Sequence, residues 1–166
     1  MADDRTLDIL KSALLLEIRG REFYRKAADS ADNAAVKEFF EHMVQEEESH
    51  VALLGEQFSL YKKNGALSGP PAQADMETVT RNVISDELKQ QIAAAGFEAA
   101  AISAAMGMEE RAIRLYSTRA EEAENPEEKE LYRWLADWET RHLETLAQID
   151  REVTEAVWND NSFWPY

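Results

Sequence analysis

Two stretches of the chain, 92 residues apart, decide the fold: residues 39–54 read FFEHMVQEEESHVALL, and residues 131–146 read LYRWLADWETRHLETL. Each contains a glutamate followed three residues later by a histidine, Glu47 with His50 and Glu139 with His142. Residues three apart lie on the same face of an α-helix, so each pair can contact one metal ion. Apolar residues recur at helical spacing around both pairs, which predicts two long helices.

The similarity between the two halves extends well beyond these stretches. At the same offset of 92 residues and without a gap, Glu17 aligns with Glu109 and Tyr24 with Tyr116. The chain is therefore interpreted as two copies of a helix hairpin, which together form an all-α four-helix bundle. Folding would bring four carboxylates and two imidazoles to one centre, and the predicted metal ligands are Glu17, Glu47, His50, Glu109, Glu139 and His142. Tyr24 and Tyr116 are candidates for hydrogen bonds to these ligands.

The predicted elements follow from apolar spacing and from helix-ending residues. The first helix covers about residues 5–30, with an apolar stripe of Leu7, Leu10, Leu14, Ile18 and Phe23. Asp32 or Asn33 caps the second, and the loop from Lys62 to about Thr78 is long enough to cross between the two ends of the bundle. A short helix is expected near residues 79–92, a third long helix over 97–124, and a fourth from Asn125 and Pro126 to about Trp158.

Length and composition restrict the class of protein. A chain of 166 residues suits one domain, predicted as a bundle over residues 1–158 and an aromatic tail over 159–166 that packs on the bundle or on a partner subunit. The absence of cysteine excludes disulfides, zinc-thiolate sites and iron-sulfur clusters. The net charge of -15 opposes binding to nucleic acid or to anionic membranes. The acidic start and the short apolar run at 13–16 favour a cytoplasmic protein.

The predicted ligands suit particular metals. Carboxylate oxygens bridge and neutralise cations, while imidazole favours iron over magnesium or calcium, so we expect two iron ions, with manganese or a mixed pair as alternatives. His42, the third histidine, aligns with Trp134, and the residue three positions before it is Phe39. His42 is therefore interpreted as a partly buried or surface residue outside the ligand set.

With these residues identified, the chain resembles the rubrerythrin-like branch of the ferritin-like superfamily over about residues 8–150. Four stretches carry the resemblance, at residues 17–28, 39–54, 109–120 and 131–146. It implies a ferritin-like bundle with a long crossover between helices two and three, and a di-iron centre that reacts with peroxide or dioxygen. It also implies a homodimer or larger assembly, with Glu17 and Glu109 as terminal ligands, Glu47 and Glu139 as bridges, and both histidines as terminal nitrogen ligands.

The chain departs from the rubrerythrin pattern in two respects. Rubrerythrins proper carry an iron module bound by four cysteines, so here electrons would have to come from a separate electron-transfer protein. Peroxidase rubrerythrins have a further glutamate where this chain has Ala112, and the remaining six ligands resemble a bacterioferritin ferroxidase centre. Glu48 stands where bacterioferritins carry their haem-binding methionine, so no haem is expected.

Three functions remain open from the sequence. The first is an oxidoreductase that binds Fe(II), reacts with peroxide or dioxygen and takes electrons from another protein. The second is a ferroxidase that passes oxidised iron to storage or transfer. The third is a non-catalytic interaction module in which the metal only links the helices.

Overall fold

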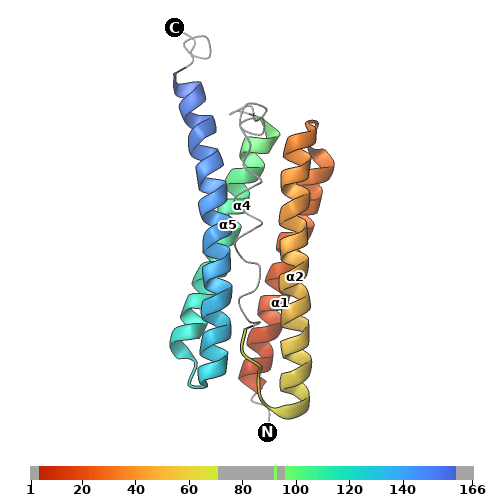
Figure 1. Cartoon of the computed structure of the whole chain (residues 1–166), viewed down its shortest axis with the longest axis vertical. Helices are drawn as coiled ribbons and strands as arrows, with labels where there is room; N and C mark the ends of the chain where they lie inside the picture. Colours follow the sequence, from red (N-terminus) through yellow and green to blue (C-terminus); the bar gives the residue numbers. More distant parts are fainter. Residues whose placement is uncertain (1–3, 71–91, 93–95, 160–166) are drawn as a thin grey trace.

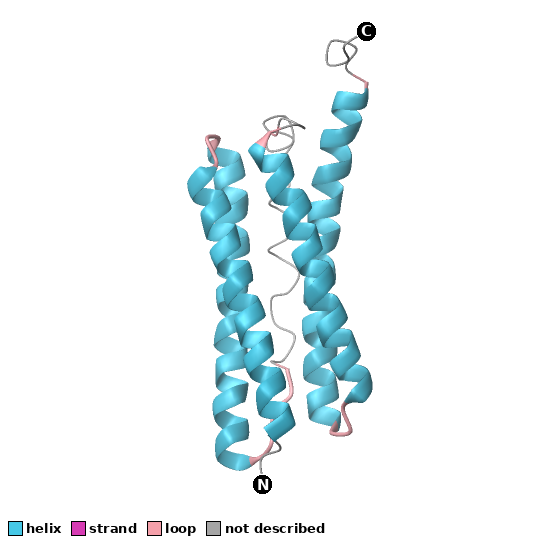
Figure 2. Ribbon diagram, turned by 180° about the vertical axis from the view of Figure 1, so that it is seen from behind, coloured by secondary structure: helices cyan, strands magenta, loops and turns pink. Residues whose placement is uncertain are grey.

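The computed structural model describes residues 4–70, 92 and 96–159, and its elements are four long helices. They are α1 (Asp4–Ser30), α2 (Ala34–Asn64), α4 (Phe97–Glu122) and α5 (Pro126–Trp158), packed side by side (Figure 1). No strand occurs among the described residues (Figure 2). The predicted all-α four-helix bundle is therefore confirmed. Among the described residues, no helix has a stretch that is both long enough and apolar enough to cross a membrane.

The four helices form two antiparallel hairpins, α1 with α2 and α4 with α5 (Figures 1 and 2). Helix α2 ends beside the start of α1, whereas α4 begins at the opposite end of the bundle (Figure 1). The end of α2 and the start of α4 therefore lie at opposite ends of the bundle, which agrees with the long crossover predicted between them. The short helix predicted near 79–92 lies outside the described residues except for Ile92, which is buried in the core.

Two asparagines at equivalent repeat positions start α2 and α5. The Asn33 side chain accepts hydrogen bonds from the backbone N–H groups two and three residues later, at 2.8 and 3.3 Å, and Asn125 does the same at 2.8 and 3.3 Å. Asn33 is therefore the cap, and Asp32 is not. The loop expected from Lys62 starts later, because α2 continues to Asn64 and ends at Gly65, whose φ of 69° is accessible to glycine.

The inward face of α1 differs from the predicted apolar stripe. Ile18 was assigned to that stripe, but its side chain is 37% exposed. The buried face runs instead through Leu10, Ala13, Glu17, Gly20, Tyr24 and Ala27. Apolar spacing was misleading here because the face that enters the core contains a carboxylate and a glycine.

Two apolar clusters fill the bundle and leave its middle to polar residues. One cluster includes Phe39, Phe40, Ile102, Leu146 and Ile149. The other includes Leu10, Leu54, Leu131, Tyr132 and Leu135. On every helix the predicted ligands lie between residues of the two clusters, so apolar packing encloses them from both ends. Of the aromatic tail predicted at 159–166, only Asn159 lies within the described residues.

Candidate metal centre

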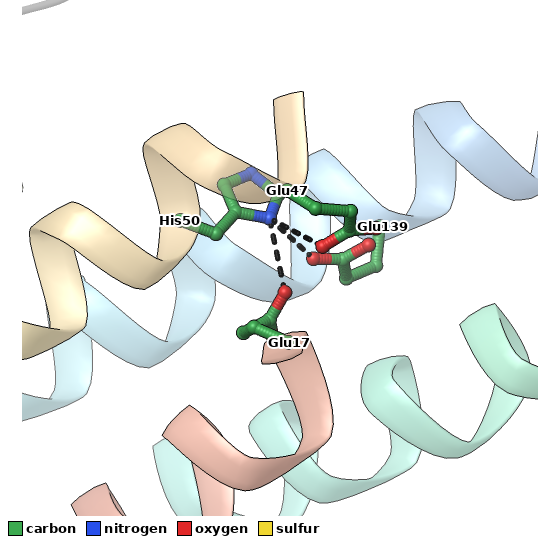
Figure 3. A group of neighbouring side chains, drawn as sticks. All are labelled: Glu17, Glu47, His50 and Glu139. Carbon is green, nitrogen blue, oxygen red and sulfur yellow. Dashed lines mark hydrogen bonds and ion pairs between the residues drawn. The ribbon is translucent and has the colours of Figure 1, made fainter. Parts of the chain in front are cut away.

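The six predicted ligands meet in the middle of the bundle, and each is at most 3% exposed. Their donor atoms form two groups, in each of which the atoms lie within 4.8 Å of one another. The first group is Glu17, Glu47, His50 and Glu139 (Figure 3), and the second is Glu47, Glu109, Glu139 and His142. Glu47 and Glu139 belong to both groups. The arrangement therefore offers two adjacent cation positions that share two carboxylates.

Both imidazoles direct Nδ1 toward these carboxylates. His50 Nδ1 lies 3.0 Å from Glu139 Oε1, 3.2 Å from Glu17 Oε2 and 3.6 Å from Glu47 Oε2 (Figure 3). His142 Nδ1 lies 3.1 Å from Glu139 Oε2 and 3.8 Å from one oxygen of each other carboxylate in its group. Since Nδ1 points inward on both rings, Nε2 is left to contact the surroundings of the centre.

Burial gives this cluster unusual protonation behaviour. Burial, together with repulsion from Glu139, raises the pKa values of Glu47 and Glu109 well above their usual range. Burial alone would lower the pKa of His50, but the carboxylates around it outweigh burial and raise that pKa, and His142 behaves in the same way. Burial acts against the charged form of Glu139, yet the two histidines lower its pKa overall. In the metal-free protein, bound protons thus offset the negative charge of the carboxylates, and metal cations could offset the same charge instead.

The donor set passes a direct test of fit for a pair of metal ions. Glu47 Oε2 and Glu139 Oε1 are buried and accept no well-aligned hydrogen bond from the described residues, although His50 Nδ1 lies 3.6 and 3.0 Å from them. Buried carboxylate oxygens without a donor are costly unless a cation contacts them. Four carboxylates would balance two divalent ions, and these two orphaned oxygens belong to the two shared residues.

The two tyrosines bond to the ligands in a crossed pattern. Tyr24 on α1 donates its hydroxyl hydrogen bond to Glu109 on α4, and Tyr116 on α4 donates to Glu17 on α1. Both tyrosines are fully buried. Burial and the charge of the bonded carboxylate raise each tyrosine pKa well above its usual range, so both remain hydrogen-bond donors. Each therefore restrains a carboxylate of the opposite helix.

Glu46 is a buried carboxylate beside the centre that sequence analysis missed. It accepts a hydrogen bond from His142 Nε2, and Trp138 Nε1 donates to the same Glu46 oxygen at 3.3 Å. His42 Nε2 lies 3.3 Å from the other oxygen, with the His42 side chain 23% exposed. Burial opposes ionisation of Glu46, but His142 outweighs it and lowers the pKa. The repeat could have drawn attention to Glu46, because its equivalent position in the second half holds a large aromatic residue, Trp138.

A small cavity of about 10 Å³ reaches the centre between α1 and α4. Three of its lining residues are the ligand candidates Glu17, Glu47 and Glu109, and the others are Leu16, Gly20, Met108 and Ala112. Such a volume holds about one water molecule. The four non-ligand residues occupy equivalent positions of the two halves, Leu16 with Met108 and Gly20 with Ala112. A molecule with one or two non-hydrogen atoms is therefore the size that this opening suits.

Comparison with known protein families gives a match over most of the chain. Residues 8–149 match the sequence model of the rubrerythrin family. The matched range contains all six predicted ligands, both tyrosines and Glu46. The searches of curated proteins and of solved structures gave no match.

Proposed function

Since the chain belongs to the rubrerythrin family, we propose that it is a di-iron carboxylate oxidoreductase that reacts with peroxide or dioxygen. Its electrons would come from a separate protein. The observation that carries this proposal is the burial of four carboxylates and two imidazoles as two donor groups sharing Glu47 and Glu139. That arrangement is typical of two-metal carboxylate bundles.

Each residue has a defined role in this proposal. Glu17 and His50 would hold one ion, and Glu109 and His142 the other, while Glu47 and Glu139 bridge the pair. The imidazoles favour iron over calcium or magnesium, and the same donors would accept manganese or a mixed pair. We infer no haem, because nothing in this donor set requires one.

Bound iron would supply the electrons that reduce peroxide or dioxygen. The chain's own residues control access and geometry. The cavity beside Gly20 and Ala112 admits a molecule about the size of water and excludes larger organic substrates. Tyr24 and Tyr116 each restrain one oxygen of a ligand carboxylate, and the apolar clusters keep bulk water away from both ends of the centre.

A second candidate function is a ferroxidase that passes oxidised iron to storage or transfer. Ala112 favours it, because the cavity-lining position that would hold the further glutamate of peroxidase rubrerythrins offers only a methyl group. The net charge of -15 would also attract Fe(II) to the surface.

Metal analysis combined with repeated oxidation separates the two functions. Protein purified under iron-replete conditions would receive successive additions of peroxide and a reductant while its absorption spectrum and iron content are followed. A retained cofactor cycles at constant iron content, with about two ions per chain. Consumption of Fe(II) far beyond that ratio would favour storage instead. A chain with no bound iron and no spectral response to peroxide would refute both.

We also propose a homodimer or larger assembly acting in the cytoplasm. Leu15 and Ile18, which are 48% and 37% exposed, lie three residues apart on the outer side of α1 and offer an apolar contact surface. Light scattering would measure the mass, and a monomer at micromolar concentration would contradict the assembly.

A further inference from the structure

The two halves of the repeat differ behind the imidazoles, although the predicted ligands themselves are equivalent. At the offset of 92 residues, His42 and Glu46 of α2 align with Trp134 and Trp138 of α5. One hairpin therefore carries a histidine and a carboxylate where the other carries two indoles. Because both pairs lie close to the centre, they give its two imidazoles different surroundings.

Behind His142 stands a buried carboxylate. The inward Nδ1 is the atom available to a cation, and in that state Nε2 would carry the proton and donate it to Glu46. Trp138 Nε1 lies 3.3 Å from the same Glu46 oxygen and 3.0 Å from His142 Nε2. The other Glu46 oxygen lies 3.3 Å from His42 Nε2 but accepts no hydrogen bond from the described residues. His142 and Trp138 thus hold one oxygen of Glu46, and with a cation on Nδ1 this carboxylate would favour the tautomer protonated at Nε2 and would orient the His142 ring.

Behind His50 the described part of the chain offers no such carboxylate. Its Nε2 is buried and has no hydrogen-bond partner among the described residues. The ring instead packs edge-to-face against Trp138, with ring centroids 5.2 Å apart, and against Trp134 at 6.3 Å. Unlike a carboxylate, the indole rings supply neither a strong hydrogen-bond acceptor nor a full negative charge.

We propose that these surroundings make the two metal positions unequal, with the position of Glu109 and His142 binding its ion first and more tightly than that of Glu17 and His50. Unequal positions presuppose the two-metal function proposed above. A carboxylate that accepts from the outer nitrogen makes an imidazole a stronger metal donor, and loss of such a partner typically weakens binding about 10–100-fold. Glu46 also adds negative charge on the His142 side alone. Glu46 is therefore a positioning residue that sets the order of loading.

Titration of the metal-depleted full chain with Co(II) tests the order directly. Calorimetry would follow binding, and the visible absorption bands of Co(II) would report the ligands of each ion. We expect two steps whose dissociation constants differ about 10–100-fold. Two ions of equal affinity would overturn the inequality and leave the two-metal function standing. Failure to bind Co(II) at all would overturn both.

A charge-matched pair of variants then tests Glu46 itself. Glu46→Gln keeps the shape of the side chain and removes its charge, so the tight step should weaken about 10–100-fold while the weak step stays unchanged. Glu48→Gln is the control, because Glu48 is 51% exposed and pairs with Arg25 at 3.0 Å away from the centre. Identical isotherms for the two variants would overturn the role of Glu46.

Histidine variants assign each step to a position and remain decisive if Glu46→Gln does not fold. His50→Gln should keep the tight step and lose the weak one, and His142→Gln should do the reverse. Circular dichroism would establish that both variants are helical before titration. The opposite assignment, with the tight step lost in His50→Gln, would overturn the inference.

Discussion

The hydroxyl of Tyr116 on α4 donates its hydrogen bond across the bundle to Glu17 on α1. Its repeat counterpart, Tyr24, makes the reciprocal contact with Glu109. Within the described residues, α1 packs mainly on α2 and α4 mainly on α5. These two hydrogen bonds therefore tie the hairpins together at the level of the proposed metal centre.

Tyr116→Phe should destabilise the metal-free protein. It leaves a buried Glu17 oxygen without its donor, which typically costs about 1–3 kcal/mol of unfolding free energy. Urea denaturation monitored by circular dichroism would measure the loss. Tyr132→Phe is a matched control, because Tyr132 stacks on Tyr116 at 6.2 Å and its buried hydroxyl has no hydrogen-bond partner among the described residues. Equal losses in both variants would contradict the importance of the crossed bond.

The number of bound ions should respond to two of the three histidines. His50→Ala and His142→Ala each remove the only nitrogen donor of one group, so metal content should fall from about two ions per chain to about one. His42→Ala should keep about two ions at saturating metal, because His42 belongs to neither group. Elemental analysis after gel filtration measures all three. Unchanged metal content in both ligand variants would exclude the proposed centre.

The metal-free protein should lose stability as the pH rises. Glu47, Glu109, His50 and His142 have pKa values raised in the folded state, above unfolded values of about 4.3 for Glu and about 6.5 for His. The folded state therefore binds more protons, so these contributions are complete below the unfolded pKa and disappear as the pH rises through the folded one. Glu139, with a lowered pKa, acts oppositely, and its contribution is lost only in acid.

Thermal melts of chelator-treated protein between about pH 6 and about pH 9 would measure this effect, since the window starts near the ordinary histidine pKa. The melting temperature should fall across the window. The metal-loaded protein should vary less, because cations replace the protons as compensating charges. A metal-free melting temperature that rises with pH would contradict the protonation pattern of the cluster.

The repeat was sufficient to predict the fold and to bring the six ligand candidates together. Equivalent glutamates and histidines 92 residues apart define two hairpins and one shared centre. The three-residue spacing within each hairpin places a glutamate and a histidine on the same face of a helix. Helical spacing alone could not distinguish Glu46 from its exposed neighbour Glu48. Glu46 contacts His142, 96 residues further along the chain, and local spacing carries no information about that contact.

The face of α1 was harder to predict than its existence. Apolar spacing selected Ile18, whereas the core contains Glu17 and Gly20. A helix that carries a metal ligand turns a charged residue inward, so the hydrophobic pattern and the buried face no longer coincide. The crossed tyrosine bonds were equally inaccessible, because sequence spacing relates Tyr24 to Glu17 of its own helix and says nothing about Glu109.

Ala112→Glu should increase peroxide turnover if the centre works as a peroxidase. Ala112 is 4% exposed and lines the cavity together with Glu17, Glu47 and Glu109, so a longer acidic side chain would start beside the proposed ions. The metal-free variant should be less stable, because a further buried carboxylate lacks compensation. Peroxide consumption with an excess of reductant measures turnover, and iron analysis confirms loading.

Ala104→Glu is the control for that substitution, because Ala104 lies on the exposed side of the same helix and adds the same charge. Its turnover should equal that of the unmodified chain. An Ala112→Glu variant that folds, binds about two irons and turns over no faster would favour the ferroxidase function.

Gly20→Ala should slow the reaction with peroxide without weakening the fold. A Cβ atom at Gly20 would lie 3.4 Å from Glu47 Cδ, and 3.5 and 3.7 Å from the two carboxylate oxygens, so a methyl group occupies the space beside this bridge candidate. The cavity holds only about 10 Å³, and little room would remain for a small oxidant. We expect the second-order rate constant of the iron-loaded protein to fall about tenfold, as an added barrier of about 1.4 kcal/mol would produce.

Stopped-flow absorption would measure that rate, and Gly55→Ala separates blocked access from a general effect of glycine replacement. Both glycines lie inside helices, where alanine is more favourable by about 0.5–1 kcal/mol, so neither variant should melt earlier than the unmodified chain. A Cβ at Gly55 meets none of the described atoms within 4 Å, and its rate should therefore be unchanged. If Gly20→Ala reacts as fast as Gly55→Ala with iron content equal, small molecules reach the centre by a route other than the cavity between α1 and α4.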